Sequence, residues 1–129
     1  MKSKNYSKKI SKIFKKRGFV FLEPDVILDS NYIIQRSGEN FKKLMFTFED
    51  DSGKNMCLRP DLTVASCVKY LEENTKGTSK IYYSGQAYRK SNNSKDSIVN
   101  NQLGIEIIGS KKKSSDDREI IDTILKAIN

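Results

Sequence analysis

Apolar residues recur every three or four positions in three stretches of the sequence, and this spacing predicts amphipathic helices. The stretches are residues 5–17, 62–71 and 115–128. A fourth, shorter helix is expected over residues 31–36, because Asp29 or Ser30 can cap its N-terminus. Asp61 is likewise a candidate cap for residues 62–71, and Gly18 can end the first helix.

Runs rich in β-branched and aromatic residues lie between these helices and predict strands. The runs are residues 19–27, 44–50, 55–60, 80–90 and 100–110. Pro24 has no amide to donate, so the chain is expected at an edge or a bulge there. Residues 50–53 supply turn chemistry for a hairpin, with Gly53 available for a positive φ.

The order of the predicted elements is helix, strand, helix, hairpin, helix, strand, strand, helix. Hairpins build antiparallel sheets, and the helices need a sheet face to cover. We therefore expect an α+β fold in which an antiparallel sheet is flanked by helices.

Composition narrows the class of protein. The chain has 129 residues, which fits one domain or part of one. No long apolar run occurs and the basic N-terminus lacks an apolar centre, so neither a membrane span nor a secretory signal is expected. The sequence has no histidine, so neither a zinc site nor a Cys–His nucleophile is expected. Cys57 and Cys67 lie in apolar contexts and are expected to be buried, unpaired thiols of a cytoplasmic protein.

The formal net charge is +8, which permits two interpretations. One is a nucleic-acid-binding surface, and the other is a solvated, lysine-rich surface. Lysine greatly outnumbers arginine, and the basic residues cluster mainly near the two ends. Because phosphate and base readout usually rely on arginine and interleaved aromatic residues, we favour the solvated surface and do not expect a nucleic-acid partner.

Polar residues occupy positions where a buried strand would be apolar. Gln102 and Glu106 project from one face of their strand, with Gly104 between them leaving space above the backbone. Arg89 ends the neighbouring strand and is suited to hold a carboxylate or phosphate, while Glu106 is suited to accept from an ammonium group. This pattern indicates the floor of a small-molecule site.

The loop before residues 62–71 can add to such a site. Asp61 and Thr63 are polar and close to the end of the strand that carries Arg59. Two simpler interpretations stay open: Asp61 serves only as a helix cap, and the sheet face is solvated with Arg89 and Glu106 in a surface ion pair.

Three segments carry a resemblance to a known family. They read MFTFEDDSGKNMCLRPDLT, KIYYSGQAYRK and NQLGIEIIG. Together they resemble the catalytic core of class II aminoacyl-tRNA synthetases of the histidyl type, over residues 5–128. Residues 5–28 resemble motif 1 of that family, which forms the dimer interface, with Pro24 as its characteristic proline. Residues 43–73 resemble the hairpin and helix that follow motif 1, residues 80–109 resemble motif 2, and residues 115–128 resemble the helix that comes after motif 2.

Within this family the sequence departs from true histidyl-tRNA synthetases. They usually read Arg-Pro-Glu-Gly-Thr where this chain has RPDLT, and they follow the motif 2 arginine with His-Glu-Arg. Here Ser91 and Asn92 replace the Glu and Arg, and beyond Lys90 the loop has only Lys95 as a basic residue. ATP activation needs positive charge aimed at the phosphates, and the motif 2 loop of this chain retains little positive charge for that purpose. RPDLT is similar instead to the regulatory subunit of ATP phosphoribosyltransferase, a paralogue that does not aminoacylate.

The resemblance also implies roles for individual residues. The positions that match the histidine pocket of the synthetase are Asp61, Thr63, Arg89, Gln102 and Glu106. Arg59 and Pro60 would shape the corner between strand and helix, and Gly104 would leave room at the site. In this interpretation the chain has no catalytic residue, cofactor or metal site.

The chain ends at Asn129, before the family's motif 3. The resemblance then implies that half of the pocket is absent, so the chain is either a fragment or is completed by another chain. An incomplete sheet leaves an edge and an apolar face to be covered. We therefore expect self-association or dependence on a partner.

Three functions follow, in order of preference. The first is a non-catalytic regulatory subunit, which acts with the short-form catalytic subunit of ATP phosphoribosyltransferase in the first step of histidine biosynthesis and in its feedback control by histidine. The second is the N-terminal part of a histidyl-tRNA synthetase, an ATP-dependent ligase when complete. The third is a basic nucleic-acid-binding module on a synthetase-like scaffold.

Overall fold

A computed structural model describes residues 2–73 and 76–129, with side chains from residue 6 onward. The helices are α1 (Lys2–Lys16), α2 (Ser30–Ser37), the 3₁₀ helix η1 (Glu39–Leu44), α3 (Leu62–Glu72) and α4 (Lys113–Ile128). The strands are β1 (Val20–Phe21), β2 (Ile27–Asp29), β3 (Thr47–Glu49), β4 (Asn55–Leu58), β5 (Ser79–Tyr88) and β6 (Val99–Ile108). None of the described helices is long and apolar enough to cross a membrane.

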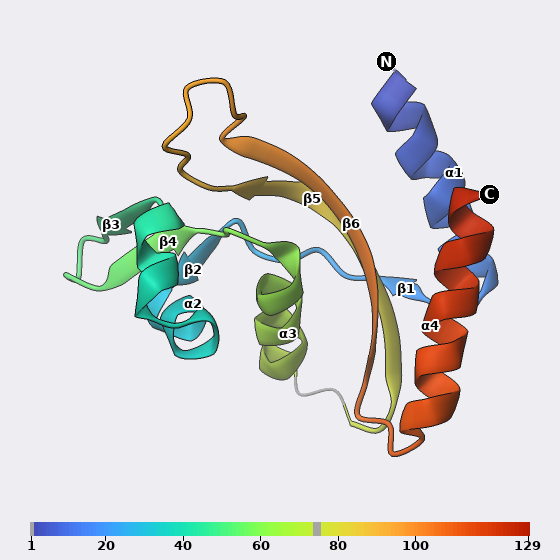
Figure 1. The fold of residues 1–129 in the computed structure, drawn as a ribbon. Coiled ribbons are helices and arrows are strands. Elements are labelled where there is room, and N and C mark those ends of the chain that lie inside the picture. Colours follow the sequence, from blue (N-terminus) through green and yellow to red (C-terminus); the bar gives the residue numbers. More distant parts are fainter. Residues whose placement is uncertain (1, 74–75) are drawn as a thin grey trace.

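The larger sheet has the strand order β1-β5-β6. β5 and β6 form a long antiparallel hairpin, in register from Ser79 opposite Ile108 to Tyr88 opposite Val99. α1 and α4 lie side by side on one face of this sheet, and α3 lies on the other (Figure 1). The face under α1 and α4 holds the first core, formed by Phe14, Phe19, Tyr82, Ile105 and Ala127.

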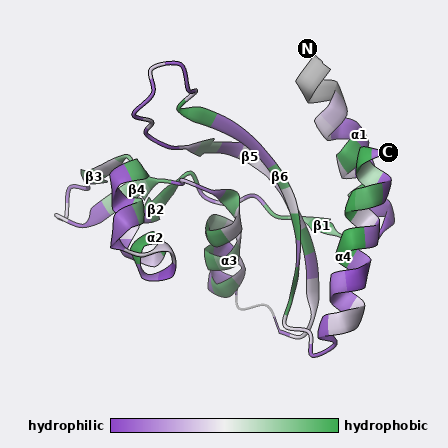
Figure 2. Ribbon diagram, viewed as in Figure 1, coloured by the Kyte–Doolittle hydropathy of each residue, from purple (hydrophilic) through white to green (hydrophobic). Residues whose placement is uncertain are grey.

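The smaller sheet has the order β2-β4-β3 and packs against α2 and α3. Its core contains Leu28, Ile33, Met45, Cys57 and Ala65. Hydrophobic residues predominate in α3, which lies between the two sheets (Figure 2). Leu62 of α3 also packs with Tyr83 and Ala87 of β5 in a third cluster. The apolar surface of α3 therefore joins the two halves of the fold.

The sequence prediction and the structure differ in the sheets. The expected antiparallel sheet is divided into two three-stranded sheets, and β1 pairs with β5 in parallel. Pro24 lies between β1 and β2, as expected for a residue that cannot donate to a ladder. The chain leaves the larger sheet after Phe21 and joins the smaller one at Ile27, so the single predicted strand over residues 19–27 is two short ones.

Candidate functional site

Arg59 is a buried structural residue at the corner between β4 and α3. Its side chain is 4% exposed. Its Nε donates to the carbonyl of Gln86 at 2.7 Å, and its Nη1 donates to the carbonyl of Pro24 at 2.6 Å. A Cβ at Gly85 would lie 2.8 Å from the Nη2 of Arg59, so glycine leaves room for the guanidinium there. Arg59 thus ties β5 to the segment between β1 and β2.

The N-terminus of α3 is held by side chains from both directions. The Asp61 carboxylate accepts from the amide of Val64 at 2.9 Å, which is the predicted helix cap. The amide of Leu62 donates to Oε1 of Gln102 at 2.8 Å, so a residue of β6 supplies a second acceptor. Asp61 therefore caps α3, Gln102 fixes its first turn against the larger sheet, and both residues also line the cavity described below.

Tyr83 is the most connected of the site residues that the sequence interpretation missed. Its hydroxyl shares a 2.8 Å hydrogen bond with the hydroxyl of Thr63 and donates to Oε1 of Glu106 at 3.1 Å. Burial raises the pKa of Tyr83 to about 12, so this hydroxyl keeps its proton at neutral pH. Tyr83 links three of the elements around the site: α3, β5 and β6.

Gly104 does not leave open space, which corrects the expectation. Tyr83 lies directly opposite Gly104 in the hairpin. A Cβ at Gly104 would lie 2.4 Å from the Tyr83 hydroxyl oxygen, so the tyrosine side chain fills the space that the glycine leaves. An aromatic residue across from a strand glycine is a known pairing.

A cavity of about 740 Å³ opens beside this arrangement. It is lined by Arg36, Ser37, Asp61, Thr63, Val64, Tyr83, Arg89, Asn101, Gln102 and Leu103. Four of the five predicted pocket residues are therefore brought together. Glu106 is the exception, because it is held by Tyr83 and is not part of the lining.

Glu106 has an unusual environment for a carboxylate. Burial raises its pKa above the ordinary value of 4.5, and the hydrogen bond from Tyr83 opposes that shift. The surface ion pair between Arg89 and Glu106, which the sequence left open, is not found among the described residues. Glu106 therefore reaches the cavity through the tyrosine hydroxyl.

Two guanidinium groups line the cavity. Arg89 donates from Nε to the carbonyl of Pro60 at 2.7 Å, and its guanidinium lies 5.4 Å from the ring centroid of Phe41. Within the described part of the chain, its two Nη atoms have no hydrogen-bond partner, so they are available to an anionic ligand. Arg36, in the last turn of α2, is the second cation of the lining. The sequence analysis did not single it out as a site residue, because a basic residue near a helix C-terminus is already favoured by the helix dipole.

The loop between β5 and β6 closes on itself. The Ser91 hydroxyl donates to Asp96 at 2.7 Å and accepts from the amide of Asn93 at 3.1 Å. The Asn93 side chain accepts in turn from the amide of Lys95 at 3.1 Å. The Lys90 ammonium lies 5.7 Å from the ring centroid of Phe46. The loop therefore carries polar groups that satisfy one another, and no arginine beyond Arg89.

Pro24 is enclosed by its own chain. Its side chain is fully buried, so an interface at this end of the molecule would be made by exposed neighbours such as Val20 and Phe21.

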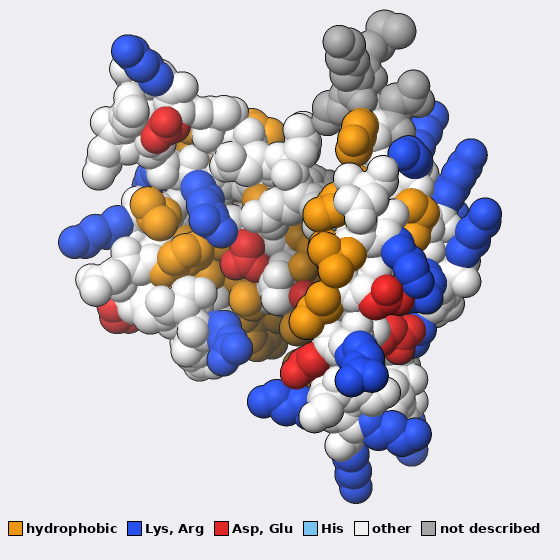
Figure 3. All heavy atoms as spheres, turned by 45° about the vertical axis from the view of Figure 1, so that its right-hand side comes forward, with side chains coloured by type: hydrophobic (Ala, Val, Ile, Leu, Met, Phe, Trp, Pro, Cys, Tyr) orange, Lys and Arg blue, Asp and Glu red, His pale blue; other side chains and the backbone are white. Residues whose placement is uncertain are grey.

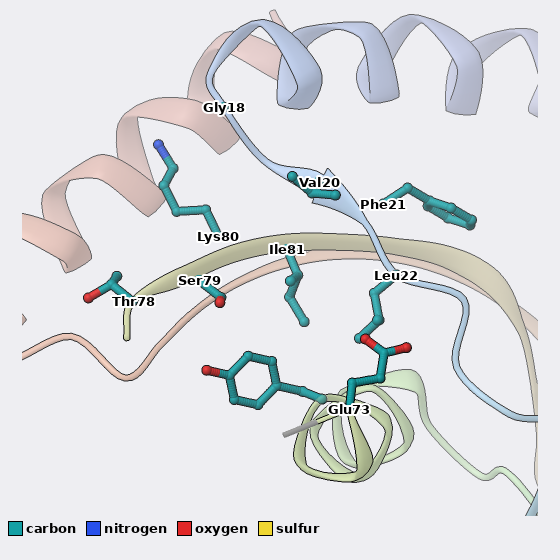
Figure 4. Close-up of a pocket in the computed structure, with 10 residues that line it drawn as sticks. Gly18, Val20, Phe21, Leu22, Glu73, Thr78, Ser79, Lys80 and Ile81 are labelled. Atoms are coloured by element: carbon teal, nitrogen blue, oxygen red, sulfur yellow. The ribbon is translucent and has the colours of Figure 1, made fainter. Parts of the chain in front are cut away.

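A second cavity of about 470 Å³ lies between β1, the start of β5 and the end of α3 (Figure 4). Lys80 lines it but points toward α4, where it binds the carbonyl of Arg17 and the carboxylate of Glu119. Among the described residues that line this second cavity, Lys80 is the one cation, and it is already used inside the protein.

Both cysteines are unpaired, as the sequence predicted. Cys57 is fully buried in the second core, and burial raises the pKa of its thiol to about 11. Cys67 is only partly buried, and burial raises its thiol pKa as well. Neither thiol has the lowered pKa of a reactive cysteine.

Comparison with known proteins places the whole chain in one family. Residues 1–129 match the family model described as Histidyl-tRNA synthetase. The chain is 31% identical over 130 residues to the histidine–tRNA ligase of Methanococcus maripaludis, covering 98% of this chain and 31% of that protein. It is also 31% identical over 113 residues to the ATP phosphoribosyltransferase regulatory subunit of Allorhizobium ampelinum, covering 86% of this chain and 30% of that protein. Identity therefore does not separate these two kinds of relative, and the chain spans about a third of their length.

Two solved structures have the same fold. A crystal structure of apo S. aureus histidyl-tRNA synthetase matches with a TM-score of 0.76 and 20% identity, covering 98% of this chain and 30% of that one. A crystal structure of an ATP phosphoribosyltransferase regulatory subunit/histidyl-tRNA synthetase from Bacillus halodurans C matches with a TM-score of 0.75 and 22% identity, covering 96% of this chain and 32% of that one. The predicted α+β fold of the class II synthetase core is thereby confirmed.

Proposed function

We propose, because this chain belongs to the histidyl-tRNA synthetase family, that it is part of a non-catalytic regulatory subunit of ATP phosphoribosyltransferase. In this role it acts in the cytoplasm with the short-form catalytic subunit. Its cavity binds histidine, and that binding changes the activity of the complex as a coupling free energy between two sites. The subunit itself performs no chemical step.

The loop between β5 and β6 is the observation that carries this proposal. A ligase must stabilise the negative charge that develops on ATP phosphates, and it does so with fixed cations. Here the loop residues Ser91, Asn93 and Asp96 bond to one another, and Lys90 lies over an aromatic ring. Lys95 is the one lysine of this loop without such a contact.

The cavity is nevertheless suited to an amino acid. The free Nη atoms of Arg89 can bind a carboxylate in a bidentate manner. Asp61 and the Glu106–Tyr83 pair supply negative charge and a hydroxyl for an ammonium group or an imidazole. The same residues therefore support ligand recognition without supporting phosphate chemistry.

The test is co-expression of this chain with a short-form ATP phosphoribosyltransferase catalytic subunit, followed by co-purification and an activity assay with and without histidine. We expect a stable complex whose activity depends on histidine. Titration calorimetry of Arg89→Gln should show weaker histidine binding, whereas Lys95→Gln, on the same loop, should not. A folded chain that neither forms the complex nor binds histidine would contradict the proposal.

A second candidate function is the N-terminal part of a histidine–tRNA ligase. The match to the Methanococcus maripaludis ligase over 98% of this chain favours it. The assay is histidine-dependent exchange of pyrophosphate into ATP by the purified chain, with Arg89→Gln as the inactive control. Exchange above that control would favour the ligase and would contradict the regulatory proposal.

A further inference from the structure

The second cavity is separate from the cavity proposed to bind histidine, which we call the histidine cavity. The two share no lining residue. Asp61 and Thr63 line the histidine cavity at the N-terminal end of α3, whereas Tyr70 and Glu73 line the second cavity at its C-terminal end. The volume of the second cavity, about 470 Å³, is typical of a small-molecule site. Its role can therefore be considered independently of the proposed function.

The walls of the second cavity are mainly apolar and firmly held. Ile81 of β5 is 6% exposed, and Tyr70 of α3 is 7% exposed. The hydroxyl of Tyr70 donates to the carbonyl of Gly77 at 3.4 Å, which anchors the far end of this side chain. Leu22 and Ile81 extend from the strand side of the cavity toward α3 (Figure 4). These walls suit a ligand with an apolar body.

Glu73 supplies a negative charge to the second cavity. Its side chain extends from the end of α3 toward Leu22 (Figure 4). Within the described part of the chain, its carboxylate has no ion pair and no hydrogen bond. Lys69, the basic residue in the last turn of α3, is paired with Asp25 instead. The charge of Glu73 is therefore left for a ligand.

The end of α3 adds to this negative potential. Glu73 is the C-cap of α3, so the partial negative charge of the helix dipole lies at the same place as its carboxylate. The hydroxyl of Ser79, also in the lining, is a further acceptor. Lys80 does not neutralise Glu73, because its ammonium group is directed toward α4 (Figure 4). The second cavity thus combines apolar walls with one site of negative potential.

We propose that the second cavity binds a small organic cation, a primary amine with an apolar body. The ammonium group pairs with the Glu73 carboxylate beside the last carbonyls of α3. The apolar body packs against Leu22, Ile81 and Tyr70. An anion would be repelled by the carboxylate and by the helix end, and a neutral ligand of the same shape would gain nothing from either.

The charge of the whole chain opposes unspecific attachment of a cation. The formal net charge is +8. Lys and Arg side chains are prominent around the side of the molecule formed by α1 and α4 (Figure 3). Such a surface repels amines over most of its area. Saturable binding of an amine therefore requires the local negative potential at Glu73.

The test is NMR titration of the isotope-labelled chain at neutral pH with two amines, benzylamine and isopentylamine. Benzyl alcohol and benzoate are the neutral and anionic comparisons for benzylamine. We expect saturable shifts of the amide signals of Glu73 and of residues 79–81 with at least one of the amines. Benzylamine should bind about five-fold or more tightly than benzyl alcohol, because it adds an ion pair at a partly solvated site. Benzoate should cause no such shifts.

Glu73→Gln removes the charge with little change of shape, and it should abolish the preference for benzylamine over benzyl alcohol. Glu72→Gln is the matched control, because it changes the net charge equally at an exposed position outside the lining, and it should bind as the unchanged chain does. Equal weakening in both variants would overturn the proposal in favour of net charge alone. It would also be overturned by saturable shifts confined to Asp61 and Thr63 in the histidine cavity, or by none with either amine.

Discussion

Tyr83 and Gly104 fit together across β5 and β6 as one packing unit. A Cβ at position 104 would lie 2.4 Å from the Tyr83 hydroxyl oxygen and 2.5 Å from its Cζ. Because inserted atoms in a packed site force neighbours to move, Gly104→Ala is expected to lower the free energy of unfolding by about 1–3 kcal/mol. Urea unfolding at neutral pH measures this change.

The control for Gly104→Ala is the removal of its neighbour. Tyr83→Val takes away the ring that the new methyl group would meet. In the double variant, the cost of Gly104→Ala should therefore largely disappear, which is a non-additive result. Additive losses would show that the glycine is needed for its backbone and not for the space that Tyr83 fills.

Glu106 makes the stability of the chain depend on pH in a specific direction. Burial raises its pKa above 4.5, so the folded chain holds this proton to a higher pH than the unfolded chain does. This contribution to stability is fully present below the ordinary carboxyl pKa and is lost as pH rises through the folded value. Glu106→Gln keeps an acceptor for Tyr83 and cannot ionise. We expect it to raise the free energy of unfolding at neutral pH and to flatten this part of the pH dependence, measured by urea unfolding from acid to neutral pH.

Tyr83→Phe provides the matching control. The hydrogen bond from Tyr83 lowers the pKa of Glu106 and so opposes the effect of burial. Without that donor, the pKa of Glu106 should rise further, which carbon-detected NMR titration of its carboxyl group can follow. A lower pKa in the variant would contradict the role of Tyr83 as the donor that stabilises the ionised carboxylate.

At the scale of elements, Arg17 connects the end of α1 to α4. It donates to the carboxylate of Asp122 and, at 3.3 Å, to the hydroxyl of Thr123. Lys126, one turn farther along α4, binds the same carboxylate at 3.0 Å. The hydrogen bonds from Lys126 and Arg17 lower the pKa of Asp122. One exposed carboxylate thus adds a polar link between the end of α1 and α4, beside the apolar contacts of the first core.

This lowered pKa predicts an acid-sensitive contact. A depressed carboxyl pKa contributes stability that is present above the ordinary value of 3.8 and is lost as pH falls through the folded value. Asp122→Asn is therefore expected to lower the Tm at neutral pH, and to lower it less in acid. Asp117→Asn, on an exposed position of α4, is the control and should change the Tm little at either pH. An equal loss for Asp122→Asn at both pH values would contradict the prediction.

The elements also show where sequence analysis succeeds and where it stops. The four predicted helices and both hairpins are present, because helical spacing and turn residues are local signals. The parallel pairing of β1 with β5 was missed, because alternation marks which face of a strand is buried and not which strand lies beside it. The pattern of polar residues in the sequence also predicted correctly that Asp61 and Gln102 lie at one site. It gave no signal for Tyr83, since an apolar-looking IYY run is equally typical of a core strand.

At the scale of the whole molecule, apolar surface remains outside the cores. The larger sheet ends at β1 on one side and β6 on the other. On β1, Val20 is 67% exposed and Phe21 is 43% exposed. An uncovered strand edge with apolar side chains favours association. We predict that the chain self-associates through β1, so that its sedimentation coefficient rises with concentration in analytical ultracentrifugation.

Val20→Asp tests where this association occurs, because its exposed side chain leaves the cores intact. It should shift the chain toward the monomer. Ile121→Asp is the matched control, since Ile121 is 60% exposed on the outer side of α4 and presents a different apolar surface. Dissociation by Ile121→Asp alone would move the interface to α4, where Leu125 and Ile128 are also exposed. A chain that stays monomeric at all concentrations and unfolds in a single cooperative transition would contradict the prediction. It would show that the fold is stable with the edge of β1 and its apolar side chains exposed to water.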